Sequence, residues 1–347
     1  MATVALRTPD AEGVAFGSRP RDRDWLIPVT IIVVIELLLW LLSYSAGFSY
    51  APQLTAYGAV AYSCMALVLA YHTLAVLYRT RGQPPLRSLA QAAFADKTRI
   101  VSIVGGLQLV ILGSSAFGAL KAAMPKIVPF WLDPHIYRLE AELIGEPAWQ
   151  LSAQLLGWAT PFIELVYSTF VPVHVMATFA VVLLRPSSLK TRAMVSLFAI
   201  WLLLGVFGAY VFSSAGPIFY DRVYGGDIAA GLTDTLRRAP VAVRTADSLW
   251  VLHHLDRPAV GNGISAMPSM HIALTLWLAL ILNKTRASAL GWTYLALIYV
   301  GSIHLGWHYV SDGVVSSIGV LGIWRFSRGA ASSPTDNIAA KGTVFGP

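Results

Sequence analysis

Charged residues are scarce in this sequence of 347 residues. Asp, Glu, Lys and Arg together make up 12% of the chain, whereas a soluble domain usually carries about 25%. Apolar residues make up 56%, and the mean hydropathy is +0.62. This composition is typical of a protein that crosses a membrane several times. The net charge of +7 then reflects loop residues that set topology, and we expect no nucleic-acid partner.

Cysteine is also scarce, because the chain holds only Cys64, inside an apolar run. A disulfide within the chain and a cysteine metal site are therefore excluded. Residues 1–24 lack an apolar core with a cleavage site, so we expect a cytoplasmic tail and not a cleaved signal. Residues 327–347 are rich in Gly, Ala, Ser and Thr and are predicted to form a disordered tail.

Residues 25–326 are predicted to form one all-α membrane domain, a bundle of about eight transmembrane helices. Shorter amphipathic helices are expected at the membrane surface in residues 80–98 and 121–160, and a polar helix in residues 213–267. Apolar runs of spanning length lie near residues 25–47, 55–78, 100–120, 161–184, 193–212, 268–283, 287–305 and 309–326.

The distribution of basic residues predicts how this bundle is oriented. With eight spans, 17 of the 25 Lys and Arg residues fall on the side of the termini and 8 on the other side. Positive loops face the cytoplasm, so both termini are predicted to be cytoplasmic. His271 and His308 then lie at the opposite face, toward the periplasm, the exterior or a lumen.

These two histidines belong to the stretch with the strongest chemical signal, residues 261–312. His308 and Asp312 are four residues apart, so on a helix they share one face. A carboxylate beside an imidazole fixes its tautomer and makes it a competent nucleophile or base. Pro268 suits the first position of a helix, which places His271 in a first turn whose free N–H groups favour phosphate.

The sequence motifs in this stretch resemble those of a known family. P-S-M-H at residues 268–271 and H-Y-V-S-D at residues 308–312 are similar to the second and third motifs of the type-2 phosphatidic acid phosphatase superfamily. The longer reading S-A-M-P-S-M-H is most similar to the branch that contains inositol phosphorylceramide synthases. The resemblance covers roughly residues 213–326.

The resemblance implies phosphoryl transfer without a metal or other cofactor. His308 would form a phosphohistidine, Asp312 would orient it, and His271 would protonate the leaving alcohol. Ser269 and nearby backbone N–H groups would bind phosphate oxygens. The substrate would be a membrane phospholipid or polyprenyl-type phosphate, and the acceptor either water or an alcohol such as inositol or a sugar. The resemblance does not set the oligomeric state.

The sequence departs from the family pattern at its cationic positions. The family's first motif, a lysine followed seven residues later by Arg-Pro, is absent, and Ser302 stands where an arginine usually precedes the nucleophile. Arg222, with Tyr220, follows a Gly-Pro turn and is a candidate phosphate-binding cation. The alternative is an interfacial loop charge. Arg257 is the second candidate.

Each of these residues also has a structural interpretation. His308 and Asp312 could be a hydrogen-bonded pair at a helix start, and His271 an interfacial cap. His304 lies one turn before His308, so it either binds substrate or invites a metal site with His271. Glu164 and His174 either line a headgroup pocket or hold helices together.

Glu36 is a further carboxylate within an apolar run, and we interpret it as structural. For the whole protein, two functions are considered. The sequence predicts a membrane phosphatase or phosphotransferase that acts on a lipid phosphate. The alternative is a lipid transporter or scaffold that keeps the fold without catalysis.

Overall fold

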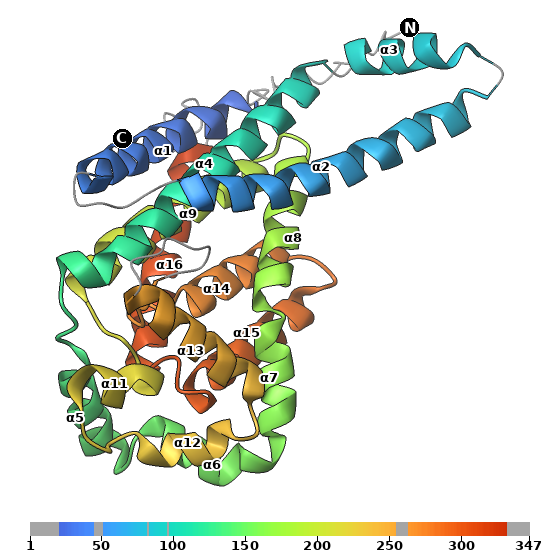
Figure 1. Cartoon of the computed structure of the whole chain (residues 1–347). Helices are drawn as coiled ribbons and strands as arrows, with labels where there is room; N and C mark the ends of the chain where they lie inside the picture. The colour runs from blue at the N-terminus through green and yellow to red at the C-terminus, as the bar shows by residue number, and fades with distance from the viewer. Residues whose placement is uncertain (1–20, 45–50, 82, 96, 255–262, 332–347) are drawn as a thin grey trace, which may run out of the picture.

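The computed structural model describes residues 21–44, 51–81, 83–95, 97–254 and 263–331, and these form helices and no strand (Figure 1). The predicted tails therefore lie mostly outside the described residues. The first helices are α1 (Arg23–Tyr44), α2 (Ala51–Arg79), α3 (Pro85–Ala95), α4 (Lys97–Ile127), α5 (Asp133–Ile144), α6 (Ala148–Leu156), α7 (Thr160–Ser168) and α8 (Phe170–Leu183). The others are α9 (Ser188–Ile200), α10 (Ala209–Val211), α11 (Tyr220–Tyr224), α12 (Ala230–Leu236), α13 (Pro240–His254), α14 (Met270–Leu282), α15 (Ser288–His304) and α16 (Val310–Ala331).

Long apolar helices confirm the predicted membrane bundle. Among the described residues, five segments are long and apolar enough to cross a bilayer. The three remaining predicted spans correspond to α14, α15 and α16, and α14 is a shorter apolar helix of 13 residues. The five segments are Arg23–Tyr44, Gln53–Arg79, Lys97–Ile127, Ala148–Leu183 and Ser188–Val211.

Several predicted boundaries differ from the structure. The fourth apolar segment begins at Ala148 and not at residue 161, because α6, α7 and α8 follow one another with only short breaks. One break lies at Gly157–Ala159, just before Pro161, whose ring and missing N–H interrupt regular helical hydrogen bonding. At the other end of the chain, α16 continues to Ala331, past the predicted boundary at residue 326.

The core is built around α9 and α14. Helix α9 packs against α1, α14 and α16, and α14 also packs against α15 and α16. The large side chains of Trp25 on α1 and Trp277 on α14 are fully buried, and the Trp277 indole donates a hydrogen bond to the Ala193 carbonyl. By contrast, α2 and α3 extend away from this core in Figure 1, and α2 exposes Leu67 and Leu74 as a lipid-facing helix does.

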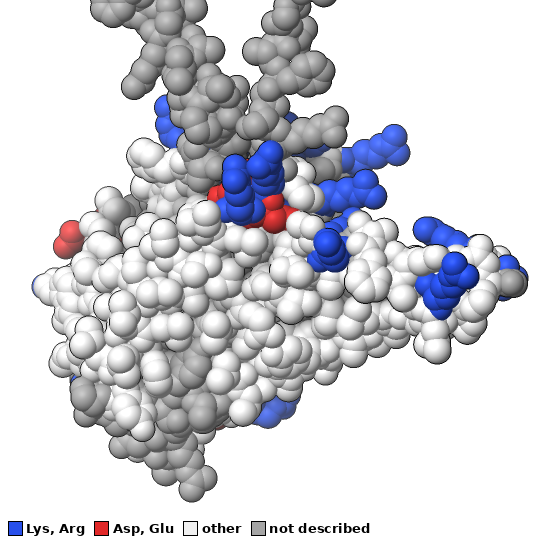
Figure 2. All heavy atoms as spheres, turned by 90° about the horizontal axis from the view of Figure 1, so that it is seen from above, with Lys and Arg blue, Asp and Glu red and all other residues white. Residues whose placement is uncertain are grey.

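The two ends of the bundle differ in chemistry. At one end Lys190 pairs with Asp22 at 2.9 Å, and Arg192 donates to the Trp324 carbonyl at 2.8 Å. Seen from above, this side gathers Lys and Arg side chains with few acidic ones (Figure 2). The short helices α5, α6, α11 and α12 lie at the opposite end (Figure 1). The fold thus brings the segment before α1, the start of α9 and the second half of α16 together at one end.

Candidate active site

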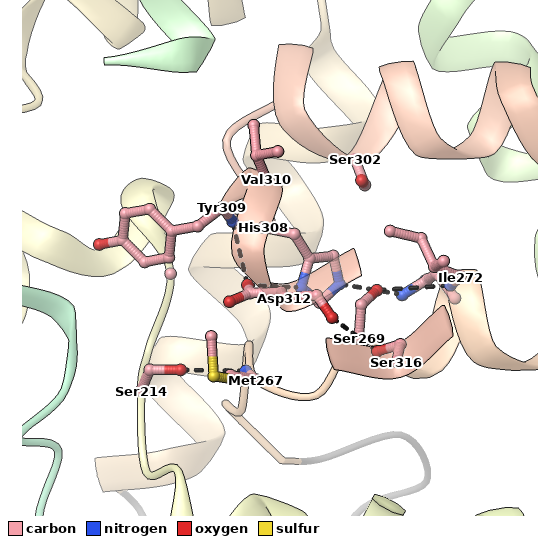
Figure 3. Close-up of polar contacts among 12 residues, drawn as sticks. Ser214, Met267, Ser269, Ile272, Ser302, His308, Tyr309, Val310, Asp312 and Ser316 are labelled. Atoms are coloured by element: carbon pink, nitrogen blue, oxygen red, sulfur yellow. Dashed lines mark hydrogen bonds and ion pairs between the residues drawn. The ribbon is translucent and has the colours of Figure 1, made fainter. Parts of the chain in front are cut away.

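Two histidines and one aspartate form a hydrogen-bonded row where α14 and α16 begin. The His308 Nδ1 atom lies 3.2 Å from Asp312 Oδ2, and His308 Nε2 lies 3.4 Å from His271 Nδ1. Figure 3 shows the His308 ring beside the Asp312 carboxylate. Asp312 is fully buried and His308 is 4% exposed. The structure therefore brings together the three residues that the motifs predicted to act together.

Helix capping explains how His308 meets Asp312. Helix α16 begins at Val310, so His308 precedes the helix and does not share a helical face with Asp312 as predicted. Asp312 is the third helical residue, and its Oδ2 atom accepts the Tyr309 N–H at 3.0 Å. A side chain at this position that reaches back to the capping residue is one half of a capping box. The same carboxylate oxygen thereby fixes both the turn and the imidazole.

Ser269 also has a capping role, at the start of α14. Helix α14 begins at Met270, and the Ser269 hydroxyl accepts the Ile272 N–H at 3.4 Å. Ser269 is therefore the N-cap, and Pro268 lies before the cap and not at the first helical position as predicted. The Ser269 side chain is fully buried in this cap, which gives no support for its predicted contact with phosphate. His271 lies in the first turn, as predicted.

Residues 213–219 form a bracket that joins the two motif segments. The Ser214 hydroxyl accepts the Met267 N–H at 3.0 Å, beside the turn before α14 (Figure 3). The Ile218 N–H donates to the Gly306 carbonyl at 2.8 Å, in the turn before α16. Gly216 has φ +94°, and a Cβ there would lie 2.5 Å from the Trp307 carbonyl oxygen. Only glycine fits this close approach.

Helix α5 contributes two carboxylates that the motifs did not indicate, Asp133 and Glu140. Asp133 accepts hydrogen bonds from the bracket, and Glu140 accepts the Val310 N–H at 2.6 Å. Burial raises the pKa of both carboxyl groups, and their backbone hydrogen bonds oppose this rise. Buried, hydrogen-bonded carboxylates at a distance from the motifs carry no local sequence signal, although an acidic residue in an apolar setting is itself unusual.

A largely apolar cavity of about 730 Å³ lies beside the histidines. His271 is one of its lining residues, and its ring packs between Phe170 and Tyr167, with ring centroids 4.2 and 4.8 Å away. The volume is in the range of sites that hold a small organic molecule or part of a lipid. His271 therefore stands between this cavity and His308.

Glu164 and His174 both line the cavity, as one of the two sequence interpretations proposed. The Glu164 carboxylate also accepts the Ala242 N–H at 2.8 Å, so it anchors the start of α13. His174 lies among aromatic rings, including Trp201 and Trp277. Both residues combine a structural contact with a place in the cavity wall.

With this geometry established, comparison with known proteins identifies the family. Residues 134–326 match the model of the PAP2 superfamily. The chain belongs to the PAP2 superfamily. The match begins earlier than the motifs suggested, at residue 134 and not near 213. No curated protein and no solved structure matches the chain significantly.

In this PAP2 chain, Arg222 contacts α13 and is not among the residues that line the cavity. Its guanidinium pairs with Asp247 of α13 and lies 5.9 Å from the centroid of the Trp250 ring. Neither partner lines the cavity. Tyr220 is buried against Tyr137, with ring centroids 5.6 Å apart. These contacts give no support for phosphate binding by Arg222 or Tyr220, and the rival Arg257 lies outside the described residues.

A basic residue that the sequence analysis missed lines the cavity instead. Lys121, near the end of α4, lines the same cavity as His271 and lies close enough for their charges to interact. Lys121 is followed seven residues later by Val128 and Pro129. This is the spacing of the family's first motif with valine in place of arginine. A search for Arg-Pro overlooks it, whereas a lysine within an apolar helix is itself a signal of function.

His304 has a structural place in the PAP2 bundle. Its Nδ1 atom lies 2.8 Å from the Ser152 hydroxyl, and its Nε2 atom lies 2.8 Å from the Thr160 hydroxyl. Both ring nitrogens are therefore engaged, and the residue is fully buried. These contacts join α15 to α6 and α7, and they support neither substrate binding nor a metal site shared with His271.

Proposed function

We propose that this PAP2 chain is a membrane phosphatase or phosphotransferase that transfers the phosphoryl group of a lipid phosphate through His308. The row Asp312–His308–His271, placed beside an apolar cavity, carries the proposal. The same residues serve water or an alcohol as the acceptor. The motif wording favours the branch that contains inositol phosphorylceramide synthases, and thus an alcohol such as inositol or a sugar.

The order of the contacts along the row supports a role for each residue. Asp312 engages Nδ1 of His308, which leaves Nε2 as the nitrogen that attacks phosphorus. A bond forms between Nε2 and phosphorus while the bond from phosphorus to the lipid alcohol breaks. His271 lies next to Nε2 and donates its proton to the departing alcohol oxygen. In the second step the oxygen of water or an alcohol gives its proton to His271 and bonds to phosphorus while the bond between Nε2 of His308 and phosphorus breaks.

We propose Lys121 as the cation that binds the phosphoryl oxygens. Phosphoryl transfer depends largely on preorganised positive charge around the three non-bridging oxygens. Lys121 shares the cavity with His271, whereas Arg222 is paired with Asp247. The backbone N–H groups at the start of α14 add a positive dipole on the same side.

The lipid would reach the histidines from the bilayer. Apolar residues of α2, α4 and α8 line the cavity, which suits an acyl or polyprenyl chain. The basic end of the bundle lies opposite α5, α6, α11 and α12 (Figures 1 and 2). By the positive-inside rule, we propose that this basic end is cytoplasmic and that the histidines face the outer side.

The test is turnover of a panel of lipid phosphates in detergent, including phosphatidic acid and a polyprenyl phosphate, with and without inositol. We expect phosphate release or a phosphorylated acceptor from the wild type and none from His308→Ala. His254→Ala is the matched control, because His254 is exposed on α13. Full turnover by a folded His308→Ala protein would contradict the assignment. A wild type that moves lipids without turnover would favour a transporter.

A further inference from the structure

We propose that Asp133 and Glu140 of α5 are positioning residues that hold the nucleophile turn, residues 306–310, in register with the segment before α14. The inference rests on the proposed function and adds a helix outside the two motifs to the catalytic machinery. Asp133 and Glu140 are seven residues apart, so on α5 they face the same side, two turns from each other.

Asp133 connects three segments of the chain. It is fully buried and accepts the backbone N–H groups of Ala215 at 2.8 Å and Gly216 at 2.7 Å, both in the bracket. It also accepts the hydroxyl groups of Tyr224 at 3.0 Å and Tyr309 at 3.2 Å. Tyr309 adjoins His308, and its ring extends away from that histidine (Figure 3). One carboxylate thus ties the bracket to the nucleophile turn.

Glu140 holds the other side of the same turn. Its Oε1 atom accepts the Val310 N–H at 2.6 Å, which is the first N–H of α16. A carboxylate at a helix N-terminus satisfies an otherwise free donor and favours the positive end of the dipole. Between the two carboxylates, Ile136 packs in a buried cluster with Tyr309 and Met267. The same face of α5 therefore contacts both motif segments.

This arrangement matters because the row of atoms depends on both motif segments. His308 belongs to the nucleophile turn and His271 follows the bracketed segment, and their ring nitrogens lie 3.4 Å apart. A misplacement of about 1 Å costs up to ~10²-fold in rate. Neither Asp133 nor Glu140 has a hydrogen bond to either histidine among the described contacts. Their effect on the chemistry is therefore exerted through the turn.

Four variants separate the two links. Asp133→Asn keeps the side-chain size but turns an amide N–H₂ toward donors that need an acceptor. Tyr309→Phe removes only the link from Asp133 to the nucleophile turn. Glu140→Ala removes the acceptor for Val310, whereas Glu140→Gln keeps one. Glu142→Gln is the matched control on the same helix, because Glu142 is exposed.

Two measurements are made on each full-length protein in detergent. The first is steady-state kinetics with phosphatidic acid, which separates kcat from KM. The second is hydrogen–deuterium exchange of peptides that cover residues 306–315, which reports the turn whether or not the protein turns over. His308→Ala is run in parallel to establish that turnover depends on the proposed nucleophile.

We expect kcat to fall by ~10–100-fold in Asp133→Asn and Glu140→Ala with KM within about twofold. Exchange in residues 306–315 should rise in both variants. Glu140→Gln should recover most of the rate, and Glu142→Gln should match the wild type. Tyr309→Phe should lose less than Asp133→Asn, and combining the two should cost no more than Asp133→Asn alone.

The outcomes distinguish this inference from the proposed function. If His308→Ala is inactive while Asp133→Asn and Glu140→Ala keep wild-type kcat, the proposed function stands and the positioning role is overturned. Unchanged exchange in residues 306–315 overturns it as well. A rise in KM alone would assign α5 to substrate binding and not to positioning. If no wild-type turnover is found, the proposed function fails and the inference fails with it.

Discussion

Buried carboxyl groups in two regions of the molecule differ in whether they accept hydrogen bonds. Glu36 of α1 is fully buried, and neither of its oxygens has a hydrogen-bond partner among the described residues. Near the histidines, Asp133 and Glu140 are buried as well, but Asp133 accepts two backbone N–H groups of the bracket and Glu140 accepts the first N–H of α16. A buried carboxyl group thus has no hydrogen-bond partner in one region, whereas in the other region it binds backbone N–H groups and fixes the segments that carry them.

The comparison shows where burial of a carboxyl group indicates function. A buried polar group without a partner lowers stability, whereas one with several partners fixes the geometry of the groups it binds. Glu36 lies outside the residues that match the PAP2 superfamily, and Asp312 lies inside them. Equivalent substitutions in the two regions should therefore have unequal results, which the following predictions test.

The largest effect is expected from Asp312→Asn compared with Glu36→Gln. Asn at residue 312 presents an amide to His308 and loses the charge that supports the imidazolium, so turnover should fall by roughly 10³–10⁴-fold. Glu36→Gln should keep turnover within about twofold, because Glu36 touches no residue of the row. Parallel kinetics of the two purified variants check this. Similar losses in both would remove the distinction between the regions.

The next effect concerns the cation at the site. Lys121→Met should lower kcat by roughly 10²–10³-fold, the scale for losing one main transition-state donor. Lys121→Arg should recover part of the rate, because the charge is kept with a different shape. Arg222→Ala is the control and should stay within about threefold, since it removes a partly exposed ion pair. A reversed order would return the phosphate site to Arg222.

A smaller effect is expected on stability. Glu36→Leu should raise the melting temperature in detergent by a few degrees, because it removes a desolvation penalty of about 1–3 kcal/mol. Asp133→Leu should lower the melting temperature, since it leaves the Ala215 and Gly216 N–H groups without an acceptor. Thermal unfolding of both variants beside the wild type gives the comparison. Destabilisation by Glu36→Leu would show that Glu36 has a partner that matters.

The smallest effect is expected from chelation. His271, His308 and Asp312 supply the acid, the nucleophile and its orienting group, so EDTA should leave turnover unchanged. The measurement is the rate before and after EDTA treatment, followed by addition of zinc or magnesium. Loss of activity in EDTA and its return with either metal would contradict the mechanism.

Much of this architecture was predictable from the sequence because membrane helices follow hydropathy. The apolar runs predicted the bundle, and the two motifs predicted that His271, His308 and Asp312 act together, although His308 and Asp312 do not share a helical face. The helix capping was predicted wrongly. Pro268 was assigned to the first helical position, whereas Ser269 is the N-cap and Met270 is the first helical residue. The boundary near residue 148 was also missed, because the fourth span was predicted to start at residue 161, where the structure has only a break.

The supporting groups could not be predicted in the same way. Asp133 and Glu140 act across more than 70 residues of sequence, and only the fold brings them to Gly216 and Val310. Arg222 was favoured as the phosphate-binding cation because it follows a Gly-Pro turn, yet in the folded protein it forms an ion pair with Asp247. Lys121 was overlooked because valine replaces arginine at Val128. Hydropathy and motifs thus predict the bundle and the chemistry, whereas contacts between loops need the structure.

The most direct test of the account is detection of phosphate on His308. The purified protein is incubated with phosphatidic acid, quenched in base and digested for peptide mass spectrometry, in the wild type and in His271→Ala. The account predicts an acid-labile, base-stable phosphate on His308 in the wild type, formed more slowly in His271→Ala because that histidine protonates the departing alcohol. Phosphate on another residue, or turnover by His308→Ala, would contradict it.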